Sequence, residues 1–408
     1  MKKTNKRQDA KVLEFNKNKK KKQRKSRPQS RPELTVINGG KSRPRMIRKI
    51  CLGVGIVLVI GITAALNLLS PTGITEWIQT KIALIEGGNG FPVSVSDAIT
   101  QNLYEDDGRL LLLTETDLKC YNTSGNLIYS RIHGYANPVV RTSAMRTLLF
   151  DRSGSQYKIE NPSKTIYSGD IEETIITGDI GDSGYYALAT EAEDDVAQVT
   201  VYNRNNESVY RYYSSDQYVS GVSISDNGKY LAVAVVSTEN AMLSSKLMLF
   251  DLSETEPVVQ RTFSDEMIYL CEFSGNNVGV LTNKRYCNIN PKDEYNEYAF
   301  GGKLLNKYAM SDGNALLCLA ADSNAAENTV ILLDSSAQVK KQFSVQYEIY
   351  DIYHAGTLTY VLSDQLYVYG GDGTLQTTIT VESGALAVCS AGKKAVVLYS
   401  TGMTAYDV

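Results

Sequence analysis

One short pattern recurs through most of this chain: a tight turn at a glycine joins two apolar strands. It is clearest at Gly228 in SDNGKYLAV, and the aligned turn glycines are Gly108, Gly184, Gly228, Gly275, Gly313, Gly356 and Gly392. Most intervals run from 36 residues (Gly356 to Gly392) to 47 (Gly228 to Gly275). The one interval of 76 residues is divided by TSAMRTLLFD (142–151), which has the same texture without the glycine. Similarity at such a period indicates a repeat architecture, here of eight units.

Each unit also contains a third strand, and seven units contain a fourth. The third strands are LKCYN (118–122), QYKIE (156–160), VTVYN (199–203), LMLFD (247–251), RYCNI (285–289), VILLD (330–334), LYVY (366–369) and MTAYD (403–407). Four short strands in about 40 residues make one blade of a β-propeller. The sequence therefore predicts an all-β, eight-bladed propeller over residues 89–408, with seven blades as the alternative.

The last unit predicts how the ring closes. It runs out at Val408 after three strands, whereas FPVSVS (91–96) precedes the first unit without a partner. Pairing this N-terminal strand with the last blade would complete four strands and remove two exposed sheet edges.

The repeat broadly resembles the WD-repeat, quinoprotein-like and YVTN-like propellers, although WD dipeptides are absent. The basic tail, the apolar segment, the GGNGFPVSVS entry and the unequal Tyr-rich blades are more similar to a family of membrane-anchored proteins of Gram-positive bacteria, known only as a domain of unknown function. GFPV (90–93) is the sharpest local match. The resemblance implies a fold and a location, and it offers no catalytic residues.

The region before the repeats divides into three segments. Residues 1–49 carry 19 Lys and Arg against three acidic residues, and they lack apolar periodicity, so we expect a disordered tail. Residues 50–69 contain no charge and, as a helix, would be roughly 30 Å long, which matches a bilayer core. We expect a single transmembrane helix rather than the rival, a cleaved signal peptide. Its basic flank predicts a cytoplasmic N-terminus and an extracytoplasmic propeller. That flank is Lys41, Arg43, Arg45, Arg48 and Lys49.

Residues 70–88 predict a short amphipathic juxtamembrane helix. Ile74, Trp77, Ile78, Ile82 and Ile85 fall on one helical face, which could lie on the outer membrane surface or against the next domain. Trp77, the only tryptophan, is a candidate interface anchor, together with the basic flank. The basic run KNKKKKQRKSR (17–27) could bind anionic lipid or serve only to set topology, and no nucleic acid partner is expected because no aromatic residue interleaves this run.

Catalytic signatures are weak. Only His133 and His354 exist, both in connections where exposed or capping histidines are expected, and no nucleophile elbow or zinc-ligand spacing accompanies them. The five cysteines beyond residue 70 are expected to be buried free thiols. We therefore expect no enzyme activity, cofactor or metal. The alternative is a metal-dependent propeller hydrolase or lyase, acting on an envelope or extracellular substrate, with channel carboxylates as ligands.

Long connections between second and third strands favour binding instead. They occur at 190–197, 237–245 and 321–328, which should emerge on one face of the propeller, and insertions on one face often mark a binding surface. The sequence thus predicts a non-enzymatic scaffold in the cell envelope with an envelope or extracellular protein partner. The predicted partner-binding residues are Glu191, Glu193, Asp194, Asp195, Glu239, Asn240, Asp322 and Glu327.

Overall fold

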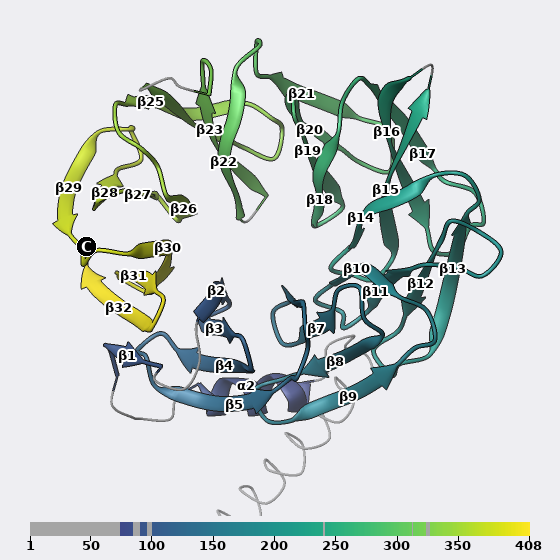
Figure 1. Ribbon diagram of the computed structural model, residues 1–408, viewed down its shortest axis with the longest axis horizontal. Helices are drawn as coiled ribbons and strands as arrows, with labels where there is room; N and C mark the ends of the chain where they lie inside the picture. Colours follow the sequence, from purple (N-terminus) through teal and green to yellow (C-terminus); the bar gives the residue numbers. More distant parts are fainter. Residues whose placement is uncertain (1–73, 85–89, 96–99, 240, 312, 324–326) are drawn as a thin grey trace, which may run out of the picture. The chain divides into compact units, whose positions relative to one another are not determined.

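The computed structural model describes residues 74–84, 90–95, 100–239, 241–311, 313–323 and 327–408. Eight four-stranded antiparallel sheets follow one another around a central axis, so the fold is an eight-bladed β-propeller, as predicted (Figure 1). The expected tail (1–49) and apolar segment (50–69) lie outside the described residues. Within the described residues there is no helix that combines the length and the apolar character of a membrane span.

The first four blades comprise the following strands. Blade 1 is β2 (Thr100–Asp106), β3 (Arg109–Thr114), β4 (Asp117–Asn122) and β5 (Leu127–Ile132); blade 2 is β6 (Pro138–Thr142), β7 (Thr147–Asp151), β8 (Gln156–Glu160) and β9 (Thr165–Asp170). Blade 3 is β10 (Ile175–Ile180), β11 (Tyr186–Thr190), β12 (Ala197–Tyr202) and β13 (Ser208–Ser214); blade 4 is β14 (Tyr218–Ile224), β15 (Tyr230–Glu239), β16 (Met242–Asp251) and β17 (Val259–Ser264).

The other four blades repeat this order. Blade 5 is β18 (Ile268–Ser274), β19 (Asn277–Thr282), β20 (Arg285–Ile289) and β21 (Tyr295–Ala299); blade 6 is β22 (Leu304–Ser311), β23 (Asn314–Ala320), β24 (Asn328–Leu333) and β25 (Val339–Val345). Blade 7 is β26 (Asp351–Ala355), β27 (Leu358–Leu362), β28 (Gln365–Tyr369) and β29 (Leu375–Thr380); blade 8 is β30 (Ala385–Ala391), β31 (Lys394–Tyr399), β32 (Gly402–Asp407) and β1 (Val93–Ser94).

Ring closure by the N-terminal strand is confirmed. Val93 pairs with Met403 and Ser94 with Gly402, which makes β1 the outer strand of blade 8. The amide of Val95 also donates to the carbonyl of Thr401 at 2.8 Å. The ring is therefore joined by backbone hydrogen bonds between segments some 300 residues apart.

The core is distributed between blades. The second strand of blade 1, RLLLLT, is buried at every position because both of its faces are covered. Side chains alternate along a strand, so Leu110 and Leu112 pack toward blade 8 whereas Leu111 and Leu113 pack toward blade 2. Clusters of this kind fill the interfaces between adjacent blades all around the ring.

The meander gives the propeller two different ends. Turns between first and second strands and between third and fourth strands emerge at one end, which we call the turn face. Connections between second and third strands and from one blade to the next emerge at the other, which we call the loop face. All seven turn glycines predicted from the repeat have positive φ, from +60° to +80°, and lie on the turn face.

The segment predicted to form a juxtamembrane helix contains a helix, α2 (Ile74–Ala83), and its position beside a membrane stays a prediction. Glu76 lies in its first turn and Lys81 in its last, an arrangement that suits the helix dipole. The remainder of the predicted 70–88 segment lies outside the described residues, apart from Leu84.

Candidate functional site

Four large, exposed apolar side chains gather on the loop face where blades 4 and 5 meet. Tyr218 begins β14, Leu243 lies near the tip of the β15–β16 hairpin, and Met267 and Tyr269 flank the start of β18. Their exposed fractions are 70%, 37%, 40% and 49%. We call these four residues the apolar patch. Exposed apolar groups that gather in this way are characteristic of interaction surfaces.

Backbone pairing holds the apolar patch together. Tyr218 is in register with Val236, and the Leu243 carbonyl accepts a hydrogen bond from the Asp265 amide at 2.8 Å. The Ser245 hydroxyl accepts a hydrogen bond from the Ile268 amide at 3.2 Å, which ties the hairpin to the start of blade 5. The patch is thus built on ordered strands rather than on irregular loops.

The sequence predicts a loop at 237–245, and this prediction is wrong. Strands β15 and β16 extend to the hairpin tip, with Ser237 opposite Ser244 and Glu239 opposite Met242. The Ser and Thr residues of this segment are compatible with a strand, and Ala241 at a φ of +62° lies in the sharp reversal. What the sequence presents as a polar insertion is therefore a strand hairpin that projects from the loop face.

The other predicted partner-binding residues also lie at the loop face. Glu191, Glu193 and Asp194 are exposed and Asp195 is half-buried in the connection from β11 to β12. Asp322 and Glu327 are exposed in the connection from β23 to β24. Glu239 ends β15, and Asn240 lies outside the described residues. Their role in binding stays a prediction.

Sequence reasoning missed the apolar patch. In a chain rich in buried strands, Tyr218 and Tyr269 look like core residues, because nothing local shows which strand ends project beyond the sheet. The usable signal was the hairpin itself: Met242 and Leu243 are large apolar residues in a segment whose other residues are Ser, Thr, Glu, Asn and Ala.

The central cavity is a second candidate site. It has a volume of about 880 Å³ and is lined mainly by the innermost strands. Its lining contains seven carboxyl groups and two guanidinium groups. The carboxyl groups belong to Glu105, Asp106, Asp107, Asp179, Asp182, Asp226 and Glu272, and the guanidinium groups to Arg141 and Arg152. The cavity is therefore strongly acidic.

Several of these carboxylates join blades to one another. Asp179 accepts hydrogen bonds from the Ser223 hydroxyl at 2.8 Å and the Ile224 amide at 3.0 Å. The Ser223 hydroxyl oxygen in turn accepts from the Phe273 amide at 3.0 Å, so one chain of hydrogen bonds crosses blades 3, 4 and 5. Asp226 likewise accepts from the Gly275 amide in the next blade at 3.2 Å. These contacts give the acidic lining a structural role.

Glu272 is the channel carboxyl with the most unusual proton affinity. Enclosure by the channel wall raises its pKa to about 7, and the negative charges of Asp179 and Asp226 add to this while Arg141 opposes it. The side chain remains accessible to solvent in the channel. A carboxyl with such a pKa can exchange a proton near neutral pH. The cavity lining nevertheless brings no histidine beside it.

The described residues provide no set of metal ligands for the alternative function, a metal-dependent hydrolase or lyase. Among the residues described, no three His, Cys, Asp or Glu side chains are grouped so that they could hold a metal ion. The channel carboxylates instead come from blades 1, 3, 4 and 5, and Asp179, Asp182 and Asp226 accept hydrogen bonds from backbone amides.

The sequence predicts exposed or capping histidines in connections; both are buried rather than exposed, and His354 lies in β26 rather than in a connection. His133 is 6% exposed, its Nδ1 accepts from the Tyr135 amide at 3.0 Å, and burial lowers its pKa. His354 is 5% exposed and its Nδ1 lies 3.2 Å from the Thr359 hydroxyl. Both are satisfied structural side chains, and the capping role holds for His133.

The cysteine prediction is confirmed for the five that the structure describes. All are free and buried: Cys120, Cys271, Cys287, Cys318 and Cys389. Burial raises the pKa of Cys120 to about 11, and those of Cys271, Cys287 and Cys318 to about 12. Their thiols are therefore inert, because the thiolate is the reactive form.

Of the predicted membrane-interface residues, only Trp77 belongs to the described part of the chain. Lys41, Arg43, Arg45, Arg48 and Lys49 lie outside the described residues, and Trp77 lies in α2.

Eight four-stranded blades in a closed ring, with an acidic channel and an apolar patch on the loop face, define an eight-bladed β-propeller. The chain belongs to a family of unknown function, DUF5711, which matches residues 92–405. No curated protein matches the chain.

The chain is similar to several solved structures, of which the WD40 domain of Sif2 supports the fold. The C-terminal WD40 domain of Sif2 is 12% identical, with a TM-score of 0.53, over 79% of this chain and 99% of that domain. BamB from Moraxella catarrhalis is 8% identical, with a TM-score of 0.48, over 78% of this chain and 99% of that protein. Hsv2 from Kluyvelomyces marxianus is 12% identical, with a TM-score of 0.45, over 65% and 90%. At these identities the likeness concerns the fold alone.

Proposed function

We propose that this protein is a single-pass, membrane-anchored scaffold whose propeller lies outside the cytoplasm and docks a protein partner in the cell envelope. The apolar segment 50–69 and its basic flank support the anchor and its orientation. The docking role rests on one observation, the apolar patch on an ordered part of the loop face.

The surroundings of the patch specify the chemistry of the partner. The connections of blades 3 and 6 place exposed acidic side chains on the same face, among them Glu191, Glu193 and Asp322. A partner that fits would carry apolar side chains for the patch and basic residues around them, since complementary charge steers and orients association. The scaffold role needs no catalytic group, so we propose that the protein is not an enzyme.

Site-specific photo-crosslinking in cells tests this function. A photoreactive amino acid replaces Tyr218 or Leu243, and in a matched control it replaces Thr378, which is exposed on the outer strand of blade 7. We expect a discrete partner to be captured from the first two positions and not from Thr378.

A second variant separates binding from folding. Tyr218→Ser combined with Leu243→Ser should abolish capture through Met267, while the melting temperature stays close to that of the native protein because both side chains are exposed. Equal capture from all positions, or capture that survives the double substitution, would remove the support for docking at the patch. Strong stabilisation of the fold by added calcium would instead favour the metal-dependent alternative.

A further inference from the structure

The helix α2 packs polar side chains against the propeller and exposes apolar side chains on its opposite side. On the side toward the blades, Thr80 is 1% exposed and the Glu76 side chain is 13% exposed. On the opposite side, Ile78 is 39% exposed and Ile82 is 59% exposed. A surface helix normally buries its apolar stripe and exposes its polar side. The exposed isoleucines of α2 therefore call for a different apolar environment.

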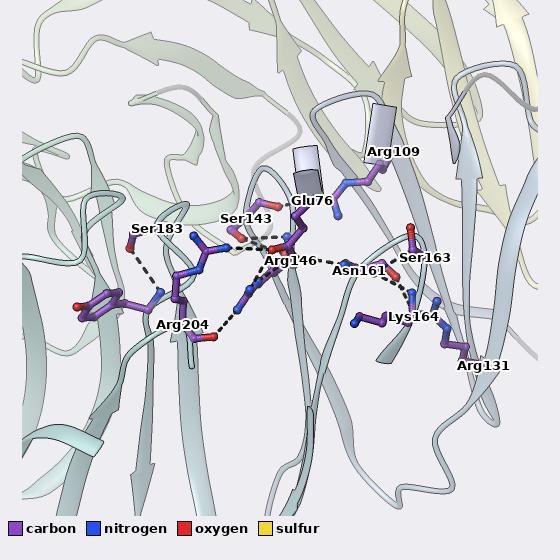
Figure 2. A network of polar contacts seen from close by, with 11 residues as sticks. Glu76, Arg109, Arg131, Ser143, Arg146, Asn161, Ser163, Lys164, Ser183 and Arg204 are labelled. Atoms are coloured by element: carbon purple, nitrogen blue, oxygen red, sulfur yellow. Dashed lines mark hydrogen bonds and ion pairs between the residues drawn. The ribbon is translucent and has the colours of Figure 1, made fainter. Parts of the chain in front are cut away.

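The buried side of α2 is fixed by charge. Glu76 accepts two hydrogen bonds from Arg146 of blade 2, at 2.9 and 3.0 Å, and one from Arg204 of blade 3 at 3.2 Å (Figure 2). Asn161 donates a further bond at 3.3 Å. Burial alone would raise the pKa of Glu76, but the hydrogen bonds and charges of these partners outweigh it and lower the pKa. The carboxylate is thus held ionised between two guanidinium groups.

Blade 1 holds the other end of the helix. The Lys81 ammonium donates to Asp107 at 2.7 Å, and the Asn122 amide donates to the carbonyl of Leu84 at 3.1 Å. The propeller residues that bind α2 in this way lie in turns between first and second strands or between third and fourth strands, or, for Asn122, at the strand end beside such a turn. The helix therefore lies across the turn face of blades 1 to 3, and its exposed isoleucines point away from that face.

The preceding sequence identifies what covers those isoleucines. The apolar segment ends at Leu69, five residues before Ile74, and five residues span at most about 18 Å. The polar layer of a bilayer is roughly 5 to 8 Å deep on each side of the hydrocarbon. A helix tied this closely to a membrane span stays at or near the lipid headgroups, where exposed isoleucine is stabilised by partial insertion.

From these observations we infer that Ile78 and Ile82 rest in the outer lipid surface and that α2 holds the turn face of blades 1 to 3 against the membrane. This inference depends on the proposed anchor. It assigns the two ends of the propeller to different surroundings: the turn face meets lipid, and the loop face with its apolar patch points away from the membrane. The competing explanation is that a second copy of the chain, rather than lipid, covers Ile78 and Ile82.

Tryptophan quenching by bromine-labelled lipid tests the inference in full-length protein in vesicles. Trp77, the only tryptophan, is replaced by phenylalanine, and one new tryptophan is placed at Asn205 on the turn face of blade 3 or, as the control, at Tyr218 on the loop face. Both sites are exposed. We expect quenching with Asn205→Trp and none with Tyr218→Trp.

The Glu76→Gln substitution gives a second readout. It should release the helix from the blades and so reduce quenching at position 205, while the protein stays in the membrane fraction. Equal quenching at both positions would overturn the inference, as would emission at position 205 that changes with the protein-to-lipid ratio, which would indicate a second copy. Failure of the proposed anchor is distinguished from these results, because the protein would then be released from vesicles by an alkaline wash.

Discussion

Removal of the negative charge of Glu76 should detach α2 without unfolding the propeller. The carboxylate accepts four hydrogen bonds, three of them from guanidinium groups, and the Arg146 side chain is only 9% exposed. Breaking a buried ion pair costs about 3–5 kcal/mol. Because the Glu76 side chain keeps 13% exposure, we take the lower limit, about 3 kcal/mol, which lowers the docking constant by roughly a hundredfold.

The helix cannot compensate for this loss by itself. A ten-residue helix is marginal in water, so α2 without its contacts to the blades should unfold more often, even where Ile78 and Ile82 remain in contact with lipid. Hydrogen–deuterium exchange of the full-length protein in lipid nanodiscs measures the effect. In Glu76→Gln, amides of residues 74–84 should exchange about a hundredfold faster, and the blades should be unchanged.

Lys81→Gln provides the matched control. The pair of Lys81 with Asp107 is more than one-third exposed on both sides, and such pairs contribute at most about 1 kcal/mol. Exchange in α2 should therefore rise less than about sixfold. If the two variants behave alike, or if Glu76→Gln leaves α2 protected, the charge does not hold the helix.

The pH dependence of docking follows from the same network. The pKa of Glu76 is lower in the folded protein than its ordinary value of 4.5. Its contribution to docking is therefore complete above about pH 4.5 and is lost as the pH falls through the lowered value. Hydrogen–deuterium exchange of residues 74–84, corrected for the intrinsic rate at each pH, should report this transition in native protein and not in Glu76→Gln.

Three further results are expected. Gly228→Ala should destabilise the folded protein by about 2–4 kcal/mol in chemical denaturation, because a Cβ would lie 2.7 Å from Tyr185 at a φ of +68°. Gly392 is the matched control, since its φ is +63° and no atom lies within 4 Å of the added Cβ. Gly392→Ala should therefore cost only the backbone strain, about 1–2 kcal/mol. Gly402→Ala would place a Cβ 2.0 Å from the Val93 carbonyl, so β1 amides should lose exchange protection while β30 and β31 keep theirs. Glu272→Gln should flatten the dependence of melting temperature on pH between about 4.5 and 7. A carboxyl whose pKa is raised by folding destabilises the folded protein as the pH rises through that window. Parallel melting profiles for native protein and Glu272→Gln would refute this prediction.

Repetition explains why so much of the fold follows from the sequence. A turn glycine such as Gly228 needs a positive φ, and its recurrence marks the same turn in blade after blade. The unpaired FPVSVS segment predicts closure because an eight-unit ring leaves one strand missing. Neither inference needs knowledge of which side chains meet.

The functional features depend on contacts between side chains from distant parts of the chain, and the sequence pattern does not indicate these contacts. The apolar stripe of α2 is visible as a pattern, but nothing local shows that Arg146 and Arg204, far along the chain, draw the opposite side onto the propeller. The Asp179 carboxyl likewise bonds to Ser223 and Ile224 only once blades 3 and 4 have packed together. The extended hairpin of blade 4 was obscured because its Ser and Thr residues are common to loops and strands alike.

Closure by β1 also constrains the order of biosynthesis. Ser94 pairs with Gly402, so the first strand of the propeller to be synthesised is the last to find its partner. At about 5–20 residues per second, the intervening chain takes roughly 15–60 seconds to make. During that interval β1 offers an unpaired edge to its surroundings. A factor that shields this edge on the nascent chain would raise the yield of closed rings without any contact in the finished protein.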